Sequence, residues 1–206
     1  IKGYIQQVMN TRLGQRQLII HQCVIEKASS RVETSSTSIH WNTFTVETNK
    51  TLTNTIVREN VKTELFQDLE HFVQNEEYYN KKGIPYKRGY MLYGPPGTGK
   101  TSIIKSIASH YGMSIYIVNM CDVERESDVI NIFKNIKGVN GYYILCFEDF
   151  DRSPFLQYDN RGRDQSIYRA FINELDGIIE CNKRITFITA NDETIITGHQ
   201  ALCRPG

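Results

Sequence analysis

The chain has 206 residues, 40% of them hydrophobic, so it is long enough to bury a substantial core and lacks the composition of a disordered tail. Lysine and arginine number 24 against 23 aspartate and glutamate residues, which excludes a global field that would hold the chain on nucleic acid or an anionic membrane. Five scattered cysteines argue against a disulfide framework or a paired zinc site and favour a reducing compartment.

No membrane-spanning segment is expected within the chain, because its longest apolar stretches fall far below the roughly 20 residues that a spanning helix needs. No secretory leader opens the sequence either. The chain starts at Ile1 without a methionine and stops at Gly206 directly after an apparent motif. An anchor upstream therefore stays open at this stage.

Two segments near the start, residues 17–27 and 38–48, alternate β-branched or aromatic residues with polar ones, which predicts strands. We interpret residues 1–56 as a small β-rich region that precedes a main domain over residues 57–206. An ordinary strand face is the preferred interpretation of three large side chains there, over a ligand-binding aromatic cluster: Trp41, Phe44 and Val46.

A helix is predicted over residues 60–79, because apolar residues recur there at helical spacing and Gly83 and Pro85 follow as stop signals. The stripe that we expect to face the core consists of Val61, Leu65, Leu69, Phe72 and Val73.

After Gly89 short apolar runs alternate with helical patterns. The apolar runs cover residues 90–93, 114–119, 142–148 and 184–190, and the helical patterns cover residues 100–111, 128–136 and 165–175. Parallel strands need crossover connections and bury both of their faces, so this alternation is typical of a parallel sheet with helices on both sides. The predicted fold class is α/β.

A phosphate-binding loop is predicted between the apolar run at residues 90–93 and the following helix. Glycines let the backbone turn its amides towards phosphate oxygens, and the helix N-terminus adds partial positive charge. In such a loop Lys100 reaches the β- and γ-phosphates of ATP, and the Thr101 hydroxyl is a ligand of Mg2+. A bland Gly/Pro turn would not explain a Lys-Thr pair at this offset. The predicted nucleotide-binding residues are Gly94, Pro95, Pro96, Gly97, Thr98, Gly99, Lys100, Thr101 and Ser102.

Acidic residues follow the apolar run at residues 143–147, at Glu148, Asp149 and Asp151. The carboxyl end of a buried parallel strand is where such folds place their ligands. One carboxylate can support the magnesium shell, and its neighbour can orient and activate the attacking water. Alone these acids could equally be a solvated strand end, but their position about fifty residues after a phosphate-binding loop favours a hydrolysis pair.

A polar residue, Asn191, ends the apolar run at residues 184–190. Its amide can hydrogen-bond both the γ-phosphate and the lytic water, which would make it a sensor of nucleotide state. A turn-forming asparagine explains the residue equally well on its own. The two preceding elements favour the sensor.

The order and spacing of these elements resemble the AAA ATPase family, and within it the mitochondrial chaperones of the BCS type, which move the Rieske iron-sulphur protein across the inner membrane. The resemblance is strong over residues 57–206 and weaker before them. It rests on the run from Gly83 to Ser102, on Glu148-Asp149 in place of the usual Asp-Glu order, on Leu175-Asp176-Gly177 and on Arg204-Pro205-Gly206.

By this resemblance Glu148 takes the magnesium-supporting position, Asp149 that of the catalytic base and Asn191 that of the sensor. Arg204 matches the first arginine finger, which reaches into a neighbouring subunit. Two departures concern the finger: the spacing from Asn191 to Arg204 is slightly longer than the family pattern, and the second arginine falls beyond the chain. A surface arginine before a Pro-Gly turn is the alternative for Arg204.

The same resemblance implies a homo-oligomer, with a ring as the expected form, that uses ATP and Mg2+ and acts on a protein cargo. It also implies an ATPase core that stops before its lid, and it leaves a membrane anchor upstream of the chain as an open possibility. The mitochondrial inner membrane is the expected location if the BCS-type resemblance holds, and the cytoplasm otherwise.

Residues 120–127 lack the aromatic-apolar-glycine pore loop with which polypeptide-threading members of the family grip an unfolded chain. This absence argues against a threading unfoldase. It agrees with the BCS-type resemblance, in which a folded cargo is handled by other means.

The leading hypothesis is an oligomeric, magnesium-dependent ATPase whose cycle moves the β-rich region and remodels or translocates a protein. A nucleotide-dependent scaffold with little turnover is the alternative, because Asp149 reaches about one methylene less far than glutamate would. An ATPase acting on nucleic acid is a third reading, disfavoured by the near-neutral charge, although Lys81-Lys82 and Lys87-Arg88 could carry phosphate contacts.

Overall fold

The computed structural model describes residues 17–27, 37–157, 166–177 and 183–192. The strands are β1 (Gln17–Lys27), β2 (Thr37–Glu47), β3 (Lys87–Tyr93), β4 (Ser114–Asn119), β5 (Tyr143–Glu148) and β6 (Arg184–Ala190). The helices are α2 (Glu59–Gln74), α3 (Glu76–Lys82), α4 (Lys100–Tyr111), α5 (Glu126–Ile136), α6 (Pro154–Gln157) and α7 (Ser166–Asp176), with short 3-10 turns η1 (Met120–Asp122) and η2 (Phe150–Arg152).

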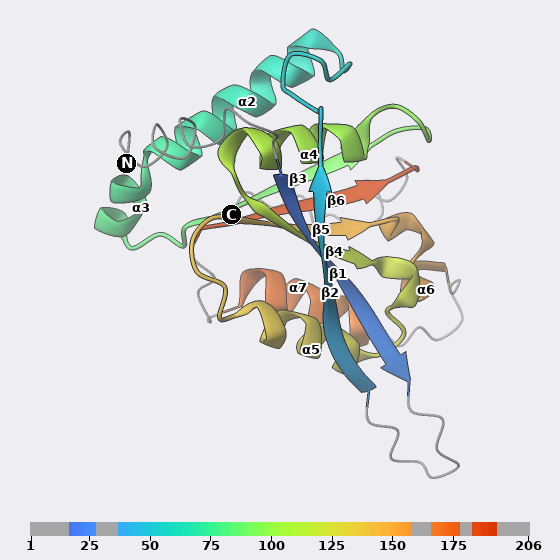
Figure 1. Ribbon diagram of the computed structural model, residues 1–206. Helices are drawn as coiled ribbons and strands as arrows, with labels where there is room; N and C mark the ends of the chain where they lie inside the picture. Colours follow the sequence, from blue (N-terminus) through green and yellow to red (C-terminus); the bar gives the residue numbers. More distant parts are fainter. Residues whose placement is uncertain (1–16, 28–36, 158–165, 178–182, 193–206) are drawn as a thin grey trace.

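The predicted α/β fold is confirmed. Six strands form one sheet in the order β2-β1-β4-β5-β6-β3, in which β1, β4, β5, β6 and β3 are parallel and β2 is antiparallel to β1. Helices α2 and α4 cover one face of the sheet, and α5 and α7 cover the other (Figure 1). No described helix is long and apolar enough to cross a bilayer.

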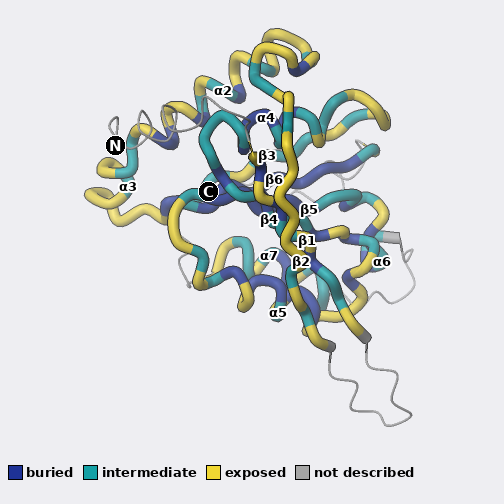
Figure 2. Tube along the Cα trace, in the orientation of Figure 1, coloured by how far each residue is buried: buried dark blue, intermediate teal, exposed yellow. Residues whose placement is uncertain are grey.

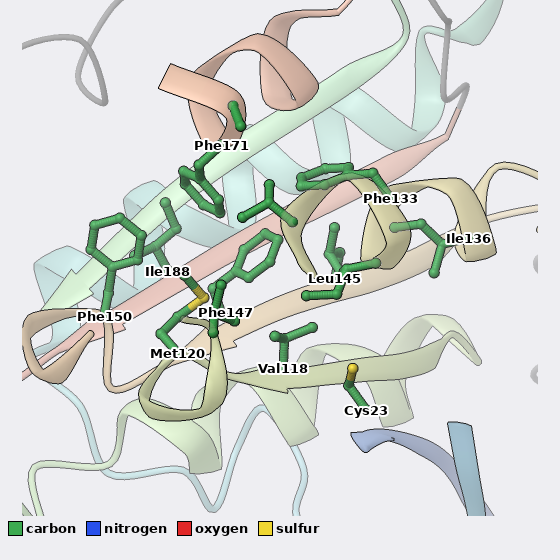
Figure 3. Close-up of a cluster of buried hydrophobic side chains, with 14 of the residues drawn as sticks. Cys23, Val118, Met120, Phe133, Ile136, Leu145, Phe147, Phe150, Phe171 and Ile188 are labelled. Atoms are coloured by element: carbon green, nitrogen blue, oxygen red, sulfur yellow. The ribbon is translucent and has the colours of Figure 1, made fainter. Parts of the chain in front are cut away.

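The central strands are buried on both faces, as a parallel sheet between two helical layers requires. In β5, Leu145 and Phe147 pack on the α5 and α7 side, whereas Ile144 and Cys146 pack on the α2 and α4 side. Figure 2 shows this burial along the middle of the sheet, and Figure 3 shows the cluster on the α5 and α7 side. The carboxyl ends of the strands are therefore rigidly placed.

The single helix predicted over residues 60–79 is wrong, because the chain divides at Asn75 into α2 and α3. The Asn75 side chain donates to the backbone carbonyl of His71 at 2.6 Å, and the Asn75 backbone carbonyl accepts the backbone N–H groups of Tyr78 and Tyr79. Asparagine competes for backbone partners in this way and so interrupts helices. Gly83, in the left-handed conformation, ends α3 as expected.

The apolar stripe of α2 is core for four of its five predicted members, and Val61 is the exception at 39% exposed. Trp41 also does not share a face with Phe44 and Val46, because side chains an odd number of residues apart in a strand point to opposite sides. Trp41 packs on the α5 side of the sheet, whereas Phe44 and Val46 remain exposed.

The two N-terminal strands extend the main sheet. β1 pairs with β4 in parallel, from Ile20 opposite Ile115 to Gln22 opposite Ile117. The division between residues 1–56 and 57–206 stays a prediction. The structure adds that the β-rich region and the strands of the main domain share one hydrogen-bonded sheet.

We expect Asp68→Asn to lower the free energy of unfolding at pH 7 by about 1 kcal/mol. Asp68 of α2 accepts hydrogen bonds from Arg88 Nε at 2.9 Å and from Tyr90 Oη at 2.6 Å. Burial alone would raise the pKa of Asp68, but these bonds and the charge of Arg88 hold it below its ordinary value.

The stability that comes from this depressed pKa is present above the unfolded-state pKa, about 3.9, and is lost as pH falls through the lower folded-state pKa. Urea unfolding of both proteins should therefore show a difference at pH 7 that shrinks in acid. Glu77→Gln is the control, because the exposed pair of Glu77 with Lys81 should contribute little. An equal loss in both variants would contradict the prediction.

Candidate functional site

The predicted site residues within the described chain lie at one edge of the sheet. The phosphate-binding loop follows β3, Glu148 ends β5, and Asn191 follows β6. The strands β3, β6 and β5 are neighbours and parallel, so their carboxyl ends lie side by side. The backbone N–H of Gly94 donates to the carbonyl of Ala190 at 3.2 Å, which joins the start of the loop to the end of β6.

The loop depends on glycine at Gly97 and Gly99, whose φ angles of 79° and 97° L side chains rarely adopt. Gly99 is also approached closely, because an added Cβ would lie 3.3 Å from the carbonyl oxygen of Ile56. Gly99 is the N-cap of α4, so the unpaired amides of the first helical turn face the loop. This is the arrangement that binds phosphate.

Lys100 is held by three acceptors in this structure. Its Nζ donates to the carbonyls of Gly94 at 2.6 Å and Pro95 at 3.1 Å, and to Asn191 Oδ1 at 3.0 Å. The ammonium group thus lies between the loop and the predicted sensor. Phosphate oxygens would be stronger acceptors than these neutral oxygens, because charge-assisted hydrogen bonds are about twice as strong.

The two predicted magnesium-supporting residues are brought together. Thr101 Oγ1 donates to Glu148 Oε1 at 3.3 Å. Burial raises the pKa of Glu148, the neighbouring Asp149 raises it further, and the bond from Thr101 and the charge of Lys105 act in the opposite direction. A hydroxyl and a carboxylate fit Mg2+, which takes a few protein oxygens beside substrate phosphates. Among the described residues no group of three or more His, Cys, Asp or Glu forms a complete metal cage.

Asp149 lies in the left-handed backbone region, with φ 51° and ψ 44°. Aspartate and asparagine tolerate this region better than glutamate does, which gives a physical reason for aspartate after Glu148. Asn191 Nδ2 donates to Asp149 Oδ1 at 3.4 Å, so the predicted base and sensor are neighbours. Asn191 therefore contacts Lys100 with its oxygen and Asp149 with its nitrogen.

The remaining predicted residues lie on the loop, in the first turn of α4 or outside the described part of the chain. Pro95, Pro96 and Thr98 are exposed on the loop, and Thr98 Oγ1 donates to the carbonyl of Pro95 at 2.8 Å. Ser102 lies in the first turn of α4, and its carbonyl accepts the Ser106 hydroxyl. Arg204 lies outside the described residues, so its role as a finger stays a prediction.

Three contacts at the site were not predicted from the sequence, although Asp151 itself was singled out as an acid after the strand. Thr189 Oγ1 accepts the backbone N–H of Asp149 at 3.3 Å, and Asp151 Oδ1 accepts the backbone N–H of Asn191 at 3.2 Å. Thr55, which is 4% exposed, donates to Ser106 Oγ at 2.9 Å and fixes the segment before α2 against α4. The spacing of Asp151 from Asp149 was the only signal, and nothing in the sequence pointed to Thr55.

The model of the family described as "ATPase family associated with various cellular activities (AAA)" matches residues 90–203. The chain is similar to the probable mitochondrial chaperone BCS1-A of Dictyostelium discoideum, with 33% identity over 76% of this chain and 38% of that protein.

Two further relatives extend the comparison. The mitochondrial chaperone BCS1 of Homo sapiens is 31% identical over 75% of this chain and 38% of its own length. An AAA-ATPase of Arabidopsis thaliana is 30% identical over 82% of this chain and 37% of its own length. The chain thus spans about two fifths of the length of the curated relatives it matches.

We expect Gly99→Ala to lower the free energy of unfolding by about 1 to 2 kcal/mol, the cost of an L side chain in a left-handed conformation. The variant should also bind ATP more weakly, because the added methyl group pushes against the Ile56 carbonyl. Gly138→Ala is the matched control, since Gly138 has open space around its Cβ position. Thermal unfolding and titration with a fluorescent ATP analogue measure both effects, and equal behaviour of the two variants would contradict the expectation.

Proposed function

The chain belongs to the AAA family of ATPases, and from this premise we propose that it is a magnesium-dependent ATP hydrolase that works as an oligomer on a protein cargo. The observation that carries the proposal is the bridge made by Asn191, whose amide contacts both Lys100 and Asp149. One side chain thereby links the residue predicted to bind phosphate with the residue predicted to activate water.

In the proposed reaction the amides of the loop and the Lys100 ammonium bind and orient the phosphates of ATP. Mg2+, when bound through Thr101 and Glu148, would neutralise charge on the phosphate oxygens. Asp149 would accept a hydrogen bond from the attacking water, and Asn191 would fix the direction of attack. Lys100 exchanges its loop carbonyls for phosphate when ATP binds, which would also release Asn191 Oδ1 to contact the γ-phosphate or the water.

An oligomer is proposed because the chain belongs to the AAA family, in which Arg204 matches the position of an arginine finger that reaches into a neighbouring subunit. Arg204 of a neighbouring subunit would supply positive charge in the transition state. The consequence is that turnover depends on assembly and hence on protein concentration.

The proposed cargo is a protein, because the relatives from Dictyostelium and human are named as chaperones. Threading is not part of the proposal. In the segment after β4, where a threading enzyme would project an aromatic loop, Met120 and Val123 are buried in the core, at 1% and 0% exposed. The names of these relatives also support a mitochondrial location, and the sequence resemblance supports the inner membrane with an anchor upstream.

The N-terminal strands are the proposed moving part, and two connections link them to the nucleotide. The segment between β2 and α2 contacts α4 through Thr55 and Ser106, and the Ile56 carbonyl lies beside the Gly99 position. β1 also pairs with β4, the strand next to β5. A shift of α4 on nucleotide exchange would therefore reach the β1–β2 pair through the buried contact of Thr55 with Ser106 and through the sheet.

We expect the full-length protein to hydrolyse ATP with a specific activity that rises with protein concentration. Lys100→Ala should weaken ATP binding about 10- to 100-fold, because it removes a charge-assisted contact with phosphate. Asp149→Asn keeps a residue suited to the left-handed backbone, so it should bind ATP normally and lose hydrolysis by at least about a hundredfold. Steady-state phosphate release and nucleotide titration separate the two effects.

Lys82→Ala, on the exposed end of α3, and Asp122→Asn, exposed after β4, are the matched controls and should retain activity. Tight ATP binding without turnover at any protein concentration would contradict the proposed hydrolase and favour the nucleotide-dependent scaffold. Stimulation by DNA or RNA with a steep salt dependence would favour the nucleic-acid alternative.

A further inference from the structure

Two of the site residues lie beyond the backbone pairing that holds the sheet together. The β5–β6 register extends as far as Phe147 opposite Ile188, and Asp149 and Asn191 follow that last pair. Past this point, side-chain hydrogen bonds set the distance between the segment that follows β5 and the end of β6. Hydrolysis geometry depends on this distance, because a displacement of about 1 Å can cost a hundredfold in rate.

Two such hydrogen bonds cross the gap in opposite directions. Thr189 of β6 accepts the backbone N–H of Asp149 at 3.3 Å, and Asp151 of η2 accepts the backbone N–H of Asn191 at 3.2 Å. The first bond fixes the backbone of the predicted base, and the second fixes the backbone of the predicted sensor. Both acceptors belong to the opposite segment, so neither residue can shift alone without breaking a bond.

We propose that Asp151 is a positioning residue for ATP hydrolysis, which sets the Asn191 carboxamide between Lys100 and Asp149 by accepting the backbone N–H of Asn191. Thr189 has the complementary role for Asp149. The inference rests on the proposed hydrolase function and assigns residues that the predicted catalytic set does not contain.

Asp151 can act in this way because its own backbone is held rigidly. The preceding Phe150 is 0% exposed and packs in the cluster on the α5 and α7 side of the sheet (Figure 3). The Ser153 hydroxyl donates to the Phe150 carbonyl at 2.6 Å, and the Arg152 N–H donates to the Asp149 carbonyl at 2.9 Å. The position of the Asp151 carboxylate is therefore set by a turn that the buried Phe150 anchors in the hydrophobic core.

Thr189 is held equally well. It is 4% exposed, and it lies in the β3–β6 pairing opposite Leu92, one residue before the loop strand ends. Its hydroxyl thus fixes the backbone of Asp149 relative to the paired strands β3 and β6. A valine at this position would keep the size of the side chain and lose the acceptor.

The role needs a hydrogen-bond acceptor at Asp151 and no negative charge. The carboxamide oxygen of asparagine lies at the same distance from the backbone as the carboxylate oxygen of aspartate, so Asp151→Asn should keep the bond, whereas Asp151→Ala removes it. A metal ligand or a general base at this position would instead need the carboxylate, and both substitutions would then be equally damaging. The pair of variants separates these possibilities.

The test is steady-state ATP hydrolysis by the full-length protein. We expect Asp151→Ala to lower kcat about 10- to 100-fold while KM changes less than about threefold, because nucleotide binding by the loop is untouched. Asp151→Asn should stay within about threefold of wild type in kcat. Thr189→Val should resemble Asp151→Ala, and Thr189→Ser should resemble wild type, which provides a second route if Asp151→Ala does not fold.

A second measurement does not depend on activity. Hydrogen exchange of the backbone N–H of Asn191 in the nucleotide-free protein should be faster in Asp151→Ala than in wild type or Asp151→Asn. Asp122→Ala is the control that removes an exposed carboxylate near the same edge and should leave both measurements unchanged.

If the wild-type protein hydrolyses ATP and Asp151→Ala has the same kcat, the inference is overturned and the proposed function still holds. Equal damage in Asp151→Asn and Asp151→Ala would overturn it in favour of a charged role. A wild-type protein that binds ATP and never hydrolyses it would overturn the proposed function, and the positioning role with it.

Discussion

The parallel pairing of β3, β6 and β5 is the constraint on which the nucleotide site depends. Neighbouring strands lie about 4.8 Å apart, and parallel strands end at the same edge. The loop after β3, the carboxylates after β5 and the amide after β6 are therefore brought within side-chain reach of one another. The bond from the Gly94 amide to the Ala190 carbonyl continues this pairing into the loop itself.

The helical layers maintain that pairing against local strain. Asp149 has a left-handed backbone conformation, which costs free energy for a residue other than glycine unless the surroundings hold it. Phe150 beside Asp149 is fully buried, and Ile103 in the first turns of α4 is 2% exposed. The hydrophobic core thus holds the unusual backbone conformation of Asp149 and the first turns of α4 at the point where phosphate and water would bind.

The extension of the sheet by β1 and β2 connects this site to the N-terminal region. β1 pairs with β4, and the segment that follows β2 packs on α4 through Thr55 and Ser106. In the proposed cycle, a nucleotide-dependent movement of α4 would act on the N-terminal strands through the contact of Ser106 with Thr55. The loop strand β3 and the strand β2 are the two outermost strands of the sheet, so the predicted nucleotide-binding loop and the proposed moving part lie at opposite ends of the strand order.

The sequence by itself determined the α/β class, five of the six strands to within one residue and the end of β3, because periodicity is a local property. Motif spacing is local too, and it predicted Lys100, Thr101, Glu148, Asp149 and Asn191 as site residues. Only the tertiary structure decided the break at Asn75, the opposite faces of Trp41 and Phe44, and the joining of β1 to β4. It also decided the left-handed conformation of Asp149 and the bonds that Thr189 and Asp151 accept. These features depend on which groups meet across the fold, and contacts between residues 40 positions apart leave no periodic signal in a single sequence.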